Sequence, residues 1–180
     1  DPNKGASRLF SDTFCLHYLH IITMHGLLGH TTSLTASARK DLRHFYDSCG
    51  NDGKKMYHLT TELLQEKGLF QRDPYFYPEA HPEYISGPKF LDAFLGDKRQ
   101  LAATEIIALS FIMKKKILEK TLSIGFSQVA QSKEVRKFLM SVQNTSDDQI
   151  QLLGTLLKKD QLPTQPSLET EVTTSQESPF

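Results

Sequence analysis

Asp41-Leu42-Arg43-His44-Phe45 is matched further along the chain by Glu134-Val135-Arg136-Lys137-Phe138, at an offset of 93 positions (134 minus 41). The same offset then places Leu63-Leu64 on Leu156-Leu157. Any two amphipathic helices share some similarity of this kind, which is the alternative explanation. We interpret the match as an internal repeat, because a second helical segment and a short turn precede each stretch. The repeating unit is then a helical hairpin.

Four segments carry apolar residues at steps of three and four, the pattern of amphipathic helices. The spacing predicts helices over residues 9–35, 38–67, 103–130 and 133–159. Ser11 and Ser132 are placed to cap the first and the fourth helix, and Gly68 is placed to end the second. The run Gly50-Asn51-Asp52-Gly53 consists of poor helix formers, yet the apolar register continues across it. We therefore expect the second helix to be unbroken.

Each predicted helix has one stripe that we assign to the core. In the second helix the stripe is Leu42, Phe45, Cys49, Met56, Leu59 and Leu63. In the fourth it is Val135, Phe138, Val142, Thr145, Gln149, Leu152 and Leu156. In the third it is Ile106, Ser110, Met113, Ile117, Thr121 and Ile124, which turns the triplet Lys114-Lys115-Lys116 toward solvent.

Two hairpins that bury each other's apolar faces make a four-helix bundle, so we predict an all-α, ferritin-like fold with one domain over residues 1–162. Residues 69–101 are rich in proline and aromatic residues and cannot form one long helix. Their length permits a long crossover or a simple up-and-down return, and we prefer the crossover found in ferritin-like folds. This segment either covers the bundle as a strap or binds a partner. Residues 163–180 form an extended or disordered tail.

Composition excludes two classes of partner. Acidic and basic residues number 21 each, so no overall field attracts nucleic acid or an anionic membrane. No apolar stretch approaches the ~20 residues of a membrane span. The two cysteines, Cys15 and Cys49, are offset along neighbouring helices and are expected to be buried and unpaired, as is usual in a reducing compartment.

The sequence predicts no catalytic residue, no cofactor and no standard metal site. Ferritin-like di-iron sites need Glu-x-x-His, which places both ligands on one helix face, and that motif is absent. The weak metal candidates are His17, His25, Asp52 and Glu105. The alternative for the first helix is structural, with His17 and His25 partly buried and His20 and His30 facing solvent. Nucleophile motifs and glycine-rich phosphate loops are also absent.

Asp52, Thr145 and Gln149 occupy core positions of the second and fourth helices, which predicts a polar layer inside the bundle. Buried polar groups cost stability unless they are paired. Two interpretations remain open. The three residues satisfy one another and fix the helix register, or they are the remnant of a former metal site.

Several stretches resemble one known family. They are residues 7–14, 94–101, 125–136 (GFSQVAQSKEVR) and 162–163. They are similar to uncharacterised proteins of Bacillus-type spore formers that are related to spore coat protein F and are ferritin-like. The family's tandem bundles imply that this chain corresponds to a central stretch of a longer member. Where Glu-x-x-His stands in the family pattern, this chain has Glu105-Ile106-Ile107-Ala108, which places metal chemistry further in doubt.

The resemblance implies a non-enzymatic structural or assembly protein of the spore coat kind, in the cytoplasm or the coat, although fold analogy alone does not establish function. It is expected to associate with itself as a dimer or with other coat proteins. The alternative is a ferritin-like protein that binds metal or handles oxidants through a non-standard site.

Overall fold

The computed structural model describes residues 5–74, 101–175 and 177, and its regular elements there are helical apart from one isolated bridge. The elements are α1 (Asp12–Ala36), α2 (Lys40–Glu66), α4 (Ala103–Val129), α5 (Lys133–Lys159) and the short 3-10 helix η1 (Glu169–Glu171). The predicted all-α class is therefore confirmed. The expected crossover falls mostly on residues 75–100, which lie outside the described residues.

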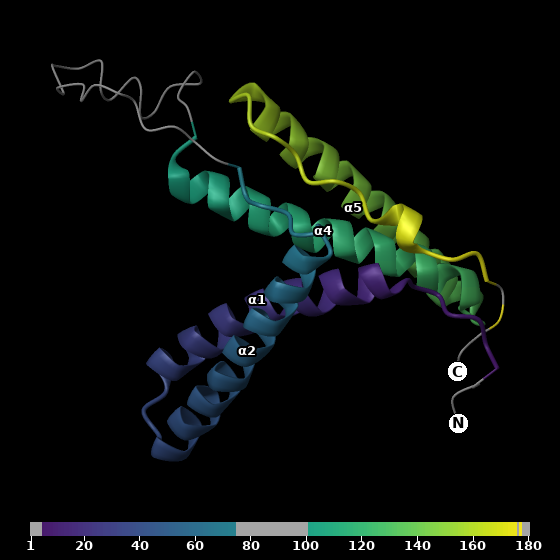
Figure 1. Ribbon diagram of the computed structural model, residues 1–180. Coiled ribbons are helices and arrows are strands. Elements are labelled where there is room, and N and C mark those ends of the chain that lie inside the picture. Colours follow the sequence, from purple (N-terminus) through teal and green to yellow (C-terminus); the bar gives the residue numbers. More distant parts are fainter. Residues whose placement is uncertain (1–4, 75–100, 176, 178–180) are drawn as a thin grey trace, which may run out of the picture.

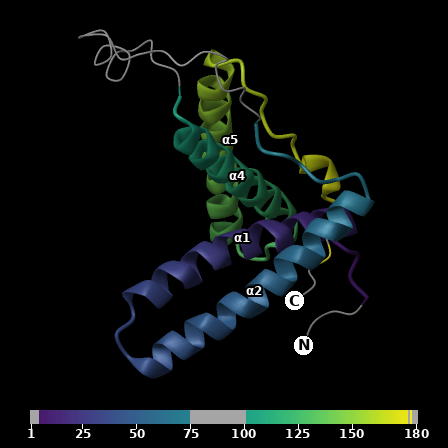
Figure 2. The same ribbon diagram turned by 60° about the vertical axis from the view of Figure 1, so that its left-hand side comes forward.

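The helices pair as two hairpins, α1 with α2 and α4 with α5, consistent with a four-helix bundle (Figure 1). The hairpins lie across one another, and α1 meets α4 (Figure 2). Their shared core draws on α1, α4, α5 and the segment after α5. Its buried residues are Phe14, Ile21, Met113, Ile117, Leu118, Leu157 and Leu168. None of the described helices is both long enough and apolar enough to cross a membrane.

The internal repeat extends to the backbone. The bounds of α2 and α5 differ by the same 93 positions at both ends (133 minus 40, 159 minus 66), and so do the last residues of α1 and α4 (129 minus 36). After α2 the chain turns through Gly68 with φ 66°, and after α5 it turns through Gln161 with φ 58°. The amide of Leu69 then donates to the Leu64 carbonyl at 2.8 Å, and that of Leu162 donates to the Leu157 carbonyl at 3.0 Å. Both helices thus end in the same left-handed turn.

This pair of turns gives a matched prediction. Gln161 holds a left-handed conformation that costs an L-residue about 1 kcal/mol and costs glycine almost nothing. Gln161→Gly should therefore raise the free energy of unfolding by up to ~1 kcal/mol, and Gly68→Gln should lower it by a similar amount. Urea denaturation checks both. A loss of stability in Gln161→Gly would contradict the equivalence of the two turns.

The predicted helix signals hold. The side chain of Ser11 accepts from the amide of Phe14 at 3.0 Å, and that of Ser132 accepts from the amide of Val135 at 3.3 Å, so both predicted caps are confirmed. The second helix is unbroken across Gly50-Asn51-Asp52-Gly53, as predicted.

The segment after α5 is extended up to and beyond η1 and runs along the second hairpin (Figure 1). Leu168 is buried in the core, and Phe10 forms an antiparallel bridge with Val172. The amide of Thr173 donates to the Leu9 carbonyl at 2.9 Å. These contacts tie the residues that precede α1 to the end of the described chain.

Two surface predictions are wrong. Lys114 is buried, because residues 67–74 lie against α4 and its ammonium pairs with Asp73 at 2.6 Å. Cys15 is exposed and Cys49 is half-buried. Both thiols are free, as expected.

Candidate functional site

Two of the weak metal candidates, His25 and Glu105, have structural partners close by. His25 stacks on Phe111 with ring centroids 3.9 Å apart, and its Nδ1 lies 2.7 Å from the carbonyl of Ile21. Glu105 accepts from the amide of Ala102 at 2.8 Å at the start of α4. Among the described residues no three or more His, Cys, Asp and Glu side chains come together as a possible metal site.

The predicted polar layer does not form as a buried cluster within the described chain. Asp52 is exposed and pairs with Lys55 at 3.1 Å, and Thr145 is also exposed. Gln149 is half-buried, and its Oε1 is a buried atom without a hydrogen-bond partner in the described structure. Asp52 and Thr145 thus face away from the buried part of their helices, and only Gln149 is partly covered. The prediction failed because apolar periodicity does not determine which side of a helix the partner helix covers.

His20 departs most from the sequence expectation, because it is buried and does not face solvent. Its Nδ1 lies 3.1 Å from Thr60 Oγ1, and its ring stacks on Tyr57 at 5.1 Å between centroids. Burial, followed by the charges of Lys114 and His17, lowers the pKa of His20 to about 4. His20 therefore stays neutral in the folded protein at neutral pH and joins α1 to α2.

The depressed pKa of His20 makes stability depend on pH. The unfolded imidazole takes up a proton near pH 6.5 and the folded one only near 4, so the contribution is complete above pH 6.5 and is lost as pH falls toward 4. Urea denaturation between pH 7.5 and 4.5 should show a loss on the order of 2 kcal/mol. His20→Gln should reduce the dependence of the free energy of unfolding on pH. The control His44→Gln, at an exposed position, should leave that dependence unchanged. An equal slope in both variants would refute this assignment.

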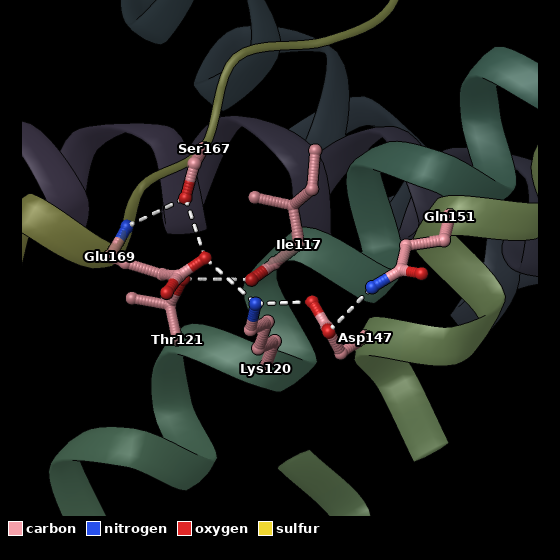
Figure 3. Close-up of polar contacts among 7 residues, drawn as sticks. All are labelled: Ile117, Lys120, Thr121, Asp147, Gln151, Ser167 and Glu169. Atoms are coloured by element: carbon pink, nitrogen blue, oxygen red, sulfur yellow. Dashed lines mark hydrogen bonds and ion pairs between the residues drawn. The ribbon is translucent and has the colours of Figure 1, made fainter. Parts of the chain in front are cut away.

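Lys120 of α4 forms ion pairs with residues of two other elements (Figure 3). Its Nζ lies 2.5 Å from Asp147 Oδ1 of α5 and 2.8 Å from Glu169 Oε1 of η1. Ser167 donates to the same Glu169 oxygen at 2.9 Å. We call Lys120, Asp147 and Glu169 the lysine clasp. No sequence pattern links its three residues, so the sequence does not predict it.

The lysine clasp borders a small hollow of about 100 Å³, whose wall also includes Thr121 and Ile150. Burial alone would lower the pKa of Lys120, but its hydrogen bonds to both carboxylates raise it overall. The same bonds lower the pKa of Asp147 and of Glu169. All three groups are thus charged at neutral pH, which suits holding the tail and does not suit proton transfer.

Lys120→Met should loosen the tail without unfolding the helices. The substitution keeps the apolar stem and removes the charge that pairs with Asp147 and Glu169. Amide hydrogen exchange should become at least severalfold faster over residues 162–175 and stay unchanged in α2. Lys116→Met is the matched control, because Lys116 pairs within α4 with Glu119. Unchanged exchange in the tail of Lys120→Met would show that the clasp does not hold it.

The largest departure from the predicted core concerns α2 and α5. Each has a broad apolar arc, and only one side of it packs within its hairpin. On α2 the uncovered side, which we call the α2 stripe, comprises Leu42, Phe45, Met56 and Leu59, exposed by 38, 58, 41 and 53%. On α5 the equivalent α5 stripe comprises Val135, Phe138 and Leu152, exposed by 50, 66 and 61%. These residues were assigned to the core of a single chain, and the described structure corrects that.

The covered side of each arc lies about a quarter turn away. Thr60 and Leu64 are buried on α2, and Leu157 is buried at the α5 position equivalent to Leu64. Because the covered and uncovered sides repeat at the same 93-residue offset, the exposure of the stripes is a property of the repeat. Several exposed apolar residues on one helix face are typical of interaction surfaces.

Comparison with known proteins supports the repeat. Residues 1–81 and residues 89–180 each match a family described as "Protein of unknown function (DUF3231)". No curated protein and no solved structure matches the chain. The two matched stretches each contain one hairpin and together span nearly the whole sequence. The chain therefore belongs to the DUF3231 family of proteins of unknown function.

Proposed function

We propose that this chain is a non-enzymatic assembly protein that associates through its helix faces. The observation that carries the proposal is the repeated, uncovered α2 and α5 stripes. Exposing seven large apolar side chains costs solubility, and such patches are retained where a protein partner covers them. The lysine clasp adds a firmly held tail and offers no acid, base or nucleophile.

The finer role that we propose is that of a coat-type structural protein with a ferritin-like arrangement and no ferritin-like chemistry. Its support is the resemblance to proteins related to spore coat protein F, which is an analogy of sequence and not of a site. The cytoplasm or the spore coat is the corresponding location. The alternative, a metal-binding or oxidant-handling protein, gains no support from the described residues, in which no three or more candidate ligands come together.

Light scattering of the purified full chain at increasing concentration tests the proposal. Association should appear at micromolar concentration, as is typical of small apolar interfaces. A chain that stays monomeric at high concentration would contradict it. Elemental analysis of the same sample separates the alternative, because stoichiometric iron, manganese or zinc would overturn the structural role.

A further inference from the structure

We infer that the partner of the α2 stripe is the α5 stripe of a second copy of this chain. This inference rests on the proposed assembly function and specifies its contact. The two stripes share three equivalent apolar positions, 42, 45 and 59 on α2 and 135, 138 and 152 on α5, whereas Gln149 of α5 stands where α2 has Met56. Two such surfaces complement one another as a helical pair packs in a bundle.

One copy cannot pair the two stripes by itself. The hairpins meet mainly through α1 and α4 (Figure 2). The core between the hairpins, which includes Phe14, Met113 and Ile117, holds α1 against α4. Bringing α2 onto α5 within one chain would expose this core, which costs more than leaving the stripes uncovered. A second copy can supply the missing helix without that loss.

Charge favours the unlike pair over two like pairs. Lys55 borders the α2 stripe, and Asp148 occupies the equivalent border position of the α5 stripe; both are exposed. An antiparallel α2–α5 pair places Lys55 and Asp148 on the same flank within about one turn of each other, because both lie close to the middle of their helices. Pairing α5 with α5 brings two aspartates together, which is repulsive, whereas each Lys55 of α2 already pairs with Asp52 of its own helix.

The ends of the same borders agree with the unlike pair. The border of α2 ends in Glu62 and Glu66, whereas that of α5 carries Lys137 and Lys159 near its two ends. An antiparallel pair sets Lys137 against the glutamates. Two copies of α5 do not gain this contact. Like charges along a border select against the wrong partner.

The size of the surface also fits a second copy. Roughly half of each of seven large side chains is exposed, about 600 Å² over one pair of stripes, and the polar borders bring the contact to about 1,000 Å². That is the lower end for a specific protein interface. Each copy carries both halves of the contact, so the contact can repeat from copy to copy. Covering the stripes would also bury Asp52, Thr145 and Gln149, the residues of the predicted polar layer.

Mixed-copy crosslinking tests the pairing. One copy carries Cys15→Ser and keeps Cys49, which belongs to the register of the α2 stripe. The other carries Cys15→Ser and Cys49→Ser with either Val142→Cys, opposite Cys49 in a parallel pair, or Gln149→Cys, close to it in an antiparallel pair. Only contacts between copies can link the two thiols. A short bismaleimide, followed by peptide mass spectrometry, reads out the links.

We expect a link from Cys49 to position 142 or 149 at several times the yield of the Cys49–Cys49 link. A dominant Cys49–Cys49 link in an associating sample would overturn the pairing and leave the assembly function standing. A monomeric sample without links would overturn both. Sedimentation therefore accompanies the crosslinking, so that the two failures are distinguished.

Charge reversal gives a second, independent readout. Lys55→Asp and Asp148→Lys should each weaken association several-fold, and the double variant should return to within about twofold of the parent. Lys54→Asp is the matched control, because it makes the same charge change as Lys55→Asp at a position that does not border the α2 stripe. Equal weakening by Lys54→Asp, or a double variant weaker than both singles, would overturn the contact between α2 and α5.

Discussion

Replacing Phe45 and Phe138 together by glutamate is expected to raise the dissociation constant of self-association by at least ~100-fold and to leave the chain folded. Both rings are more than half exposed, one on each stripe. Large aromatic side chains buried in an interface contribute ~2 kcal/mol each, and an unpaired carboxylate in their place adds a desolvation cost. In the free chain the same positions face water, so folding loses little.

Sedimentation velocity measures the association of this double variant, and circular dichroism measures its fold. Leu28→Glu is the control, since Leu28 is a similarly exposed apolar residue on α1 and lies outside both stripes. The control should associate like the parent. If the double variant associates as tightly as the parent, then the stripes are not the contact.

Leu157→Ala is expected to lower the free energy of unfolding by ~3 kcal/mol, within the 2–5 kcal/mol typical of a fully buried leucine. Leu157 is 0% exposed and lies in the core formed by α1, α4, α5 and the tail. Removing its side chain leaves a cavity at the point where four segments meet, so relaxation of any one of them cannot fill it.

Leu152→Ala is the matched control, with the same residue type on the same helix. Leu152 is on the α5 stripe and is mostly exposed, so its substitution should change stability by less than about 0.5 kcal/mol. Urea denaturation at a concentration below association compares the two. Similar losses of stability in both variants would contradict the distinction between a covered and an uncovered side of α5.

The sequence predicted the elements that depend on local chemistry. The caps at Ser11 and Ser132 and the stop at Gly68 follow from hydrogen bonds within one turn of helix, which the nearby residues determine. The repeat followed from a constant offset, which accidental similarity rarely maintains over a whole helix. The hairpins then followed, because short turns join antiparallel neighbours.

The covered side of each helix could not be predicted in the same way. On α2 the stripe and the buried pair Thr60 and Leu64 both have three-four spacing, and the centres of the two arcs lie only about 70° apart. Periodicity finds a broad apolar face, and only the partner helix decides which part of it is buried. The prediction of a polar layer failed for the same reason. It assigned Asp52 to the core, and Asp52 lies on the uncovered side of α2.

Long-range contacts explain the remaining misses. Lys114 and His20 are buried because residues 67–74 return across the helices, and Phe70 lies against the His20 ring. The lysine clasp joins residues from α4, α5 and η1 that are up to 49 positions apart (169 minus 120). Such contacts depend on the path of irregular segments, for which a sequence has no periodic signal.

The native cysteines allow the central claim, association through the stripes, to be measured in the unaltered chain. Cys49 belongs to the register of the α2 stripe, and the exposed Cys15 of α1 is an internal reference. As protein concentration rises through the association range, the rate at which a maleimide labels Cys49 should fall relative to Cys15 by at least fivefold. A ratio that stays constant while the chain associates would contradict the account.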